Sequence, residues 1–482
     1  MKDMNTDNPE VQALRARSRY TTVLAVVTAI ILAAVLIVPQ VGANNQLSAE
    51  EARLLQQFES VYQFIRDNYV DEVKAEELMQ GAMKGMFDSL DDPHSAYLTQ
   101  EDMRSLTDTT AGEFGGVGLY INKQPADGDN PRYVEVVSPI ESTPAYHAGI
   151  RGGDLIVAIE EESTAPLSID EVVDKLRGRP GTDVVVTIRR GRSSNFDVTL
   201  TRDTIQVPTV RHAMMSDGVA YLRIVQFTPY TEERVRSALD FFESEGYDQL
   251  IIDLRGNPGG LLNAVVDVSD LFLDEGLVVG TRGRVASENQ EFTSSSSTSV
   301  PAETEIAVLI DKGSASAAEI MAGALGDRNR AVLIGQQTYG KGSVQQVRGL
   351  SNGGFRLTMS RYYTPGGTYI DKKGISPHIE MLPQQLDEEE QEAAVELVTE
   401  QTIRTWAQNN TGADSDDIDA FMEELQEQGY ELPDWYLESS IDNELARARN
   451  DEPVYNLEHD LVLRQAFELM RSGEIGERLR QQ

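Results

Sequence analysis

The sequence predicts a multidomain α+β protein. Its 482 residues are enough for about three domains of roughly 150 residues each. Apolar residues at helical spacing dominate the first part, short alternating strands follow, and strands then alternate with helices. These changes of pattern suggest the following segments: 1–45, an export segment; 46–110, a helical region; 111–203, a small strand-rich domain; 204–383, an α/β core; 384–482, an acidic helical extension.

Composition excludes several classes of function. The chain has 79 acidic and 42 basic residues and a formal net charge of -37, so it repels phosphate backbones, and nucleic acid is not an expected partner. It contains no cysteine, which rules out disulfides, thiolate metal sites, iron–sulfur clusters and a cysteine nucleophile. Covalent catalysis would therefore have to use Ser, Thr, Lys or a carboxylate.

The N-terminus has the features of an export segment. Arg15, Arg17 and Arg19 precede the uncharged 19-residue run Tyr20–Val38, which ends at Pro39. A cleaved signal peptide and an uncleaved anchor both fit, but the run is longer than the usual apolar region of about 7–15 residues, which favours the anchor. By the positive-inside rule, the three arginines stay on the cytosolic side, and the chain after the apolar run lies on the other side of the membrane. We expect an inner-membrane anchor, with the body of the protein in the periplasm or another extracytoplasmic space.

Residues 46–110 should be helical. Leu54, Leu55, Phe58, Val61 and Ile65 recur at a spacing of three to four residues, as expected for an amphipathic packing helix. A second helix is expected over 76–90, and the segment 91–95 that follows is typical of a turn.

The region 111–203 alternates like a sheet, with strands expected at 133–137, 155–159 and 184–188 and one helix at 169–176. A glycine loop, 115–119, runs directly into a further strand. Its successive backbone N–H groups could form a nest for a carboxylate. A dinucleotide-binding loop is disfavoured, because there a helix follows the glycines.

The string Pro144–Ile156 resembles the AxxAGΦxxGDxI signature of PDZ domains. PDZ domains bind C-terminal peptides by adding a strand to an open sheet edge, while main-chain amides hold the terminal carboxylate. The resemblance therefore implies a protein tail as ligand. The peptide-binding residues that it implies are Gly116, Val117, Gly118 and Leu119.

The α/β region contains a glycine-rich loop at the end of a buried strand. The strand 250–254 is followed by Arg255–Gly260 and then by an expected helix at 261–272. Ligand sites of α/β folds often lie in such loops, where free amides favour negative charge. A simple tight turn would give the same pattern.

A serine and a lysine follow on separate segments. The strand 306–310 leads through a turn to Ser316 at the start of a helix, where nearby amides could stabilise an oxyanion. The serine could equally be an ordinary N-cap. Lys341 lies between two glycines; a buried lysine there could deprotonate the serine, and a surface lysine in a loop is the alternative.

Three motifs in this order resemble the carboxyl-terminal processing, or tail-specific, serine peptidases. They are Asp253–Gly260, Gly313–Glu319 and Gly340–Gln345, and the resemblance covers about 47–382. It implies a PDZ domain placed before a crotonase/ClpP-like peptidase core, and no metal or organic cofactor.

The same resemblance implies roles for individual residues. Ser316 would be the nucleophile, Lys341 the general base, and Gln345 the side chain that orients the lysine amine. The amides of Ala317 and Gly260 would form the oxyanion hole, with Gly259 as the alternative to Gly260. Arg177 would link tail binding to assembly of the site.

The five histidines offer a weaker alternative. They are scattered, none lies in an HExxH motif, and the chain has no G-x-S-x-G elbow, so a Ser–His–Asp triad and a metal site are both disfavoured. The residues are His94, His147, His212, His378 and His459.

Residues 384–482 contain 26 acidic and 7 basic residues, which is typical of a solvated helical appendage. An arm for oligomerisation or for docking an adaptor is the other interpretation, and a homo-oligomer or an adaptor lipoprotein would then be a partner. We expect a serine endopeptidase that captures proteins by their accessible C-terminal tails and cleaves nearby. A catalytically silent PDZ scaffold is the alternative.

Overall fold

The computed structural model describes residues 48–123, 132–140, 142–190, 194–449 and 451–481. The chain divides into two compact units, Met1–Gly85 and Met86–Gln482. The predicted export segment, 1–45, lies outside the described residues. Among the helices of the described ranges, none combines the length and the apolar character needed to cross a bilayer.

The first unit contains the helix α2 (Ala49–Asn68) and most of α3 (Ala75–Asp88). A reciprocal cap starts α2, because Glu51 N–H donates to Ser48 Oγ and Ser48 N–H donates to the Glu51 carboxylate. The predicted helix is confirmed. Its apolar stripe, however, stays exposed in the described structure: no residue of α2 is buried.

The segment that resembles a PDZ domain has its own core. Its main sheet has the order β3-β4-β5-β7-β8, so β3 lies at an edge, and a separate ribbon pairs β2 with β9. Inward-facing Val and Ile side chains of the sheet pack with Val172 and Leu176 of the helix α6. The bounds are β2 Glu113–Gly116, β3 Leu119–Asn122, β4 Val134–Pro139, α5 Pro144–His147, β5 Leu155–Ile159, β6 Glu162–Ser163, α6 Ile169–Leu176, β7 Asp183–Arg190, β8 Ser194–Thr201 and β9 Asp203–Gln206.

A six-stranded sheet with the order β10-β11-β12-β15-β16-β19 forms the centre of the α/β core. Strands β11, β12, β15, β16 and β19 run parallel, and β10 is antiparallel. The strand bounds are β10 Val210–Met214, β11 Val219–Ile224, β12 Gln249–Asp253, β15 Glu305–Ile310, β16 Val332–Gly335 and β19 Ile379–Glu380.

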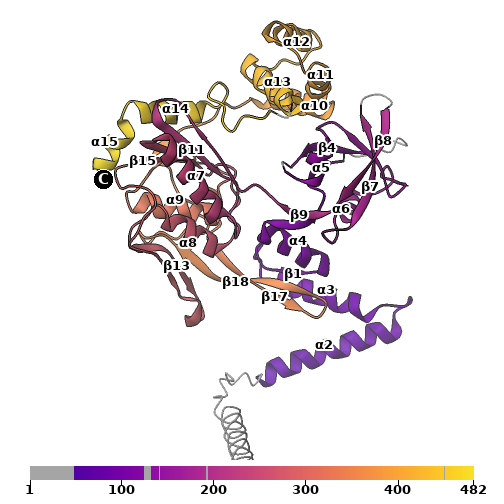
Figure 1. Ribbon diagram of the computed structural model, residues 1–482. Coiled ribbons are helices and arrows are strands. Elements are labelled where there is room, and N and C mark those ends of the chain that lie inside the picture. The colour runs from indigo at the N-terminus through magenta and orange to yellow at the C-terminus, as the bar shows by residue number, and fades with distance from the viewer. Residues whose placement is uncertain (1–47, 124–131, 141, 191–193, 450, 482) are drawn as a thin grey trace, which may run out of the picture. The chain divides into compact units, whose positions relative to one another are not determined.

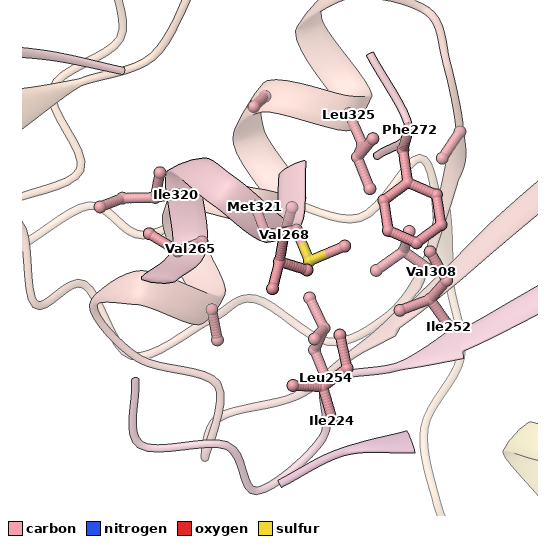
Figure 2. Close-up of a cluster of buried hydrophobic side chains, with 14 of the residues drawn as sticks. Ile224, Ile252, Leu254, Val265, Val268, Phe272, Val308, Ile320, Met321 and Leu325 are labelled. Atoms are coloured by element: carbon pink, nitrogen blue, oxygen red, sulfur yellow. The ribbon is translucent and has the colours of Figure 1, made fainter. Parts of the chain in front are cut away.

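Helices bury both faces of this sheet, which is why its central strands β12, β15 and β16 are largely apolar. Alternate residues point to opposite faces: Leu250 and Ile252 pack under α7 (Thr231–Glu245), α8 (Leu262–Asp270) and α9 (Ala317–Asp327). Figure 2 shows Ile252 in this cluster with side chains of α8 and α9. Ile251 belongs to the cluster on the other face, with side chains of α14 (Leu461–Arg471) and α15 (Glu474–Gln481). Both helices are labelled in Figure 1.

A second sheet with the order β1-β18-β13-β14 includes the hairpin partner β17 on β18. Its strands are β1 Ala96–Leu98, β13 Gly276–Gly283, β14 Glu291–Ser294, β17 Ser343–Leu350 and β18 Gly353–Tyr363, and the helix α4 spans Gln100–Ala111. The hairpin β17–β18 begins two residues after Lys341.

The acidic extension is helical and has a separate apolar core. The helices α10 (Glu388–Thr399), α11 (Thr402–Asn409), α12 (Ser415–Glu427) and α13 (Asp434–Arg449) bury Leu397, Leu425, Leu437, Ile441 and Leu445. The next helix, α14, packs on the α/β core instead. The observed architecture confirms the predicted multidomain α+β class.

Candidate active site

Ser316 lies at a strained turn between β15 and α9. Its backbone has φ 54° and ψ -112°, a region that residues other than glycine rarely occupy. The turn is held from behind, since the Asp311 carboxylate accepts the N–H groups of Gly313 and Ser314. Ser316 occupies the N-cap position of α9 in a capping box with Glu319, whose carboxylate accepts the Ser316 N–H. The N-cap alternative therefore describes its place in the helix, but its backbone lies outside the extended region that N-cap residues usually adopt.

The carboxylate of Glu319 joins the serine turn to the lysine loop. Its Oε2 accepts the backbone N–H groups of Ser316, at 2.8 Å, and Lys341, at 2.9 Å. Its Oε1 accepts the Thr338 hydroxyl, at 2.6 Å, and the Gly340 N–H, at 2.7 Å. Burial raises the pKa of Glu319 above its usual value, although these four donors favour the ionised form. The two loops are thus held in a common geometry by one side chain.

The glycine loop after β12 packs directly on the serine. A Cβ atom at Gly259 would lie 2.8 Å from Ser316 Cβ and 2.9 Å from Ala317 N, and one at Gly260 would lie 2.0 Å from the Phe227 oxygen. Both glycines also have positive φ, 105° and 144°. The close approach of two backbones therefore requires glycine at both positions.

The backbone N–H groups of Gly259 and Gly260 differ in whether they already donate a hydrogen bond. Gly259 N–H donates to Asn257 Oδ1 at 2.8 Å, and Asn257 is held by its own bond to the Ile224 oxygen. Within the described residues, the N–H groups of Gly260 and Ala317 donate no hydrogen bond. Of the two glycines predicted as oxyanion donors, Gly260 is the one whose N–H is not already used.

Lys341 is half-buried beside the strand β18. Burial lowers the pKa of its amine below the usual value, the positive charge of Arg356 lowers it further, and Glu319 opposes both effects. The lowered pKa favours the neutral amine that a general base needs. In the part of the chain that the structure describes, no hydrogen bond joins Lys341 Nζ to Ser316 Oγ; such pairs often close only when substrate binds.

Gln345 lies at the start of β17, close to the lysine in the chain. Its Nε2 donates to the Ser343 oxygen at 3.1 Å and to Ser343 Oγ at 2.8 Å. No hydrogen bond between Gln345 and Lys341 is formed among the described residues. The predicted orienting role of Gln345 remains a prediction.

The PDZ residues come together at the open sheet edge. The Val117 and Gly118 carbonyls accept bonds from Ala145 and Ile140, whereas their N–H groups donate none within the described ranges. Gly116 is buried near the end of α6, and Leu119 begins the edge strand β3. This is the arrangement expected of a loop that holds a peptide carboxylate.

Arg177 ends α6 and stacks on an aromatic ring. Its guanidinium lies 4.9 Å from the ring centroid of Phe114, a cation–π distance. The predicted link from Arg177 to the catalytic loops remains a prediction.

Two polar residues at the site were not predicted from the sequence: Glu319 and Arg356. The position of Glu319, three residues after Ser316, is that of a capping-box glutamate, and this spacing could have signalled its bond to the Ser316 N–H. The sequence offers no comparable local signal for Arg356.

Comparison with known proteins identifies the domains of this chain and its family. Family models match at 33–102 (activating protease CtpB N-terminal domain), 135–190 (PDZ domain) and 218–381 (peptidase family S41). The carboxy-terminal-processing protease of Bartonella bacilliformis is 38% identical over 366 residues, which cover 74% of this chain and 82% of that protein.

Two further relatives extend the comparison. The carboxy-terminal processing protease CtpA of Bacillus subtilis is 35% identical over 325 residues, covering 66% of this chain and 67% of that protein. A solved structure of a photosystem II D1 C-terminal processing protease is 28% identical with a TM-score of 0.41, covering 69% of this chain and 94% of that one. The predicted family is confirmed: this chain belongs to the carboxy-terminal processing proteases of peptidase family S41.

Proposed function

We propose that this carboxy-terminal processing protease cleaves its substrates with Ser316 as nucleophile and Lys341 as general base. The observation that supports these roles most strongly is the Glu319 carboxylate, which accepts the backbone N–H groups of both residues. The same site contains a strained serine and a half-buried lysine of lowered pKa, together with the Ala317 and Gly260 N–H groups, which donate no hydrogen bond within the described residues. This combination is expected of an acyl-transfer site.

The reaction follows from the residues at the site. As Ser316 Oγ attacks the scissile carbonyl carbon, the neutral Lys341 amine takes the hydroxyl proton. The Ala317 and Gly260 amides stabilise the oxyanion. When the C–N bond breaks, the lysine gives its proton to the leaving amine. A water molecule deprotonated by the same lysine then hydrolyses the acyl-enzyme.

Substrate capture is assigned to the PDZ domain. The edge strand β3 can add an extended peptide strand, and the Val117 and Gly118 amides can receive the terminal carboxylate. Protein substrates with accessible C-terminal tails are the expected partners. The uncharged run 20–38 after three arginines further supports an exported, membrane-anchored protein with an extracytoplasmic body.

The test is cleavage of a disordered substrate with a free C-terminal tail. Ser316→Ala and Lys341→Ala should each abolish turnover while tail binding persists, because neither side chain is in the PDZ domain. Substantial cleavage by either variant would refute the dyad. Tail binding by the wild type without any turnover would instead support the scaffold alternative.

A further inference from the structure

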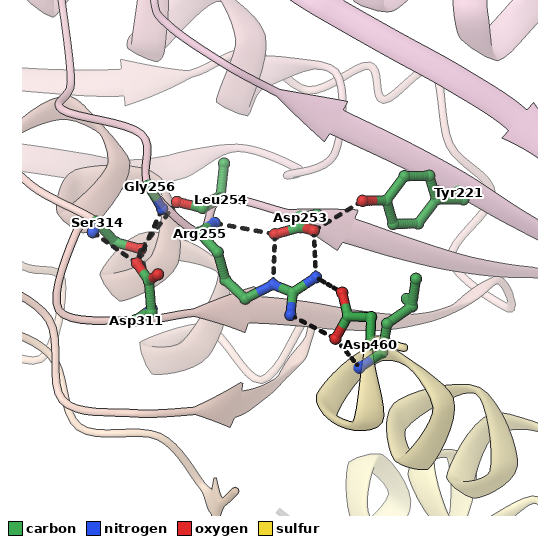
Figure 3. A network of polar contacts seen from close by, with 9 residues as sticks. Tyr221, Asp253, Leu254, Arg255, Gly256, Asp311, Ser314 and Asp460 are labelled. Carbon is green, nitrogen blue, oxygen red and sulfur yellow. Dashed lines mark hydrogen bonds and ion pairs between the residues drawn. The ribbon is translucent and has the colours of Figure 1, made fainter. Parts of the chain in front are cut away.

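Arg255, the residue that leads into the glycine loop, is clamped between two carboxylates (Figure 3). Its Nε and Nη2 donate to the two oxygens of Asp253, at 3.0 and 2.7 Å. On the other side, Nη1 and Nη2 donate to the two oxygens of Asp460, at 2.9 and 2.6 Å. The side chain is only 17% exposed. A guanidinium bound in this bidentate way on both sides has little freedom to rotate.

The two carboxylates come from different parts of the chain. Asp253 ends β12, is fully buried, and also accepts the Tyr221 hydroxyl at 2.7 Å. Asp460 is the N-cap of α14, where its Oδ1 also accepts the Leu463 N–H at 3.0 Å. Burial of Leu463, Ala466, Phe467 and Met470 against the sheet holds α14 in place. The position of Asp460 is therefore set by helix packing, independently of Arg255.

The loop that Arg255 begins reaches the reacting serine through short contacts. Gly256 N–H donates to Asp311 at 2.9 Å, and Ser314 Oγ donates to the Leu254 oxygen at 2.8 Å. Ala315 N–H donates to the Asn257 oxygen at 2.9 Å. A change in the backbone direction at Arg255 would therefore move the glycine loop relative to the serine turn.

We propose that Asp460 is a positioning residue for the peptidase reaction, acting through Arg255 to hold the glycine loop and its Gly260 amide opposite Ser316. The inference rests on the proposed function of Ser316 and Gly260. It also gives the C-terminal part of the chain, beyond the matched peptidase segment 218–381, a role in the active site.

Asp460→Asn tests this directly. The amide keeps an oxygen for the Leu463 N–H but turns an NH₂ group toward the guanidinium. We expect kcat to fall about tenfold, the kinetic equivalent of one charge-assisted hydrogen bond, with KM within about twofold. Hydrogen exchange of the 255–261 backbone should speed up, while exchange in the PDZ domain stays unchanged.

Asp217→Asn is the matched control. Asp217 pairs with Arg471 at 2.7 Å and so ties the far end of the same helix to the core, at an exposed site. If only docking of α14 mattered, this variant would lower kcat as much as Asp460→Asn does. We expect its kcat and its 255–261 exchange to match the wild type.

A second variant covers the case in which Asp460→Asn unfolds. Arg255→Lys keeps the positive charge but loses the guanidinium group that pairs with both carboxylates. It should therefore show the same changes in kcat and hydrogen exchange as Asp460→Asn. In the double variant, the kcat loss should not exceed that of Arg255→Lys alone. Additive losses, an unchanged kcat in Asp460→Asn, or an equal loss in Asp217→Asn would overturn the inference. Cleavage by Ser316→Ala in the same assay would refute the proposed function instead.

Discussion

Glu319 accepts a 2.9 Å hydrogen bond from the backbone N–H of Lys341, through the same oxygen that accepts the Ser316 N–H. The proposed nucleophile and base lie 25 positions apart in the sequence, yet one buried oxygen sets the spacing of their backbones. The relative position of the two loops therefore depends on a carboxylate that need not touch the substrate.

Glu319→Gln should impair both stability and catalysis. The amide would turn an NH₂ group toward two N–H or O–H donors and leave them unpaired, at a cost of about 2 kcal/mol or more in the free energy of unfolding. We expect kcat to fall at least tenfold, because the serine turn and the lysine loop lose their common anchor. Denaturant unfolding and peptide cleavage measure the two effects.

Asp327→Asn is the control for this prediction. Asp327 ends the same helix and accepts the Gly366 N–H at an exposed site. The activity and stability of the Asp327→Asn variant should therefore stay near those of the wild type. Wild-type kcat in Glu319→Gln would contradict the anchoring role.

Activity should rise with pH through the lowered pKa of Lys341, because only the neutral amine accepts the serine proton. Arg356→Gln removes a positive charge that lowers this pKa. The pKa should therefore rise, and the acidic limb of the kcat profile should move to higher pH. The buried Nε of Arg356 has no hydrogen-bond partner within the described residues, so the substitution breaks no bond at that atom.

The matched control for the pH profile is Arg348→Gln. Arg348 lies on the neighbouring strand β17 and is exposed, where it bonds to Gln346. Its profile should overlay that of the wild type. A shift of the Arg356→Gln profile to lower pH, or a rate that is flat from acid to alkaline pH, would exclude Lys341 as the base.

Gly118→Ala should weaken tail binding. Gly118 has φ 81°, and a Cβ there would lie 2.3 Å from Thr143, so the loop would have to shift. In the Ser316→Ala background, we expect the dissociation constant for a tail peptide to rise at least tenfold. Isothermal titration calorimetry gives this constant directly.

Gly149→Ala is the control that separates the steric clash between a Cβ at Gly118 and Thr143 from the strain of a positive φ. Gly149 also has a positive φ, 73°, in the same domain, but a Cβ there would meet nothing within 4 Å. It should cost about 1 kcal/mol of stability and leave the affinity for the tail nearly unchanged. Equal loss of affinity in both variants would argue against the glycine loop as the carboxylate site.

The sequence by itself predicted the fold class, the family and the elements on which the proposed site residues lie. Helix and strand periodicity are local properties, so the strand at 250–254 and the helix around 54–65 could be predicted from spacing alone. The motifs around Ser316 and Lys341 are also local, and this is why the resemblance located them.

Only the tertiary structure decided the remaining contacts. Asn257 Oδ1 accepts the Gly259 N–H, whereas the Gly260 N–H has no acceptor among the residues that the structure describes; the glycine run itself does not reveal this difference. Asp460 meets Arg255 across 205 positions of sequence. Such pairs form because packed helices and strands bring distant segments together, and no local pattern of residues encodes that distance.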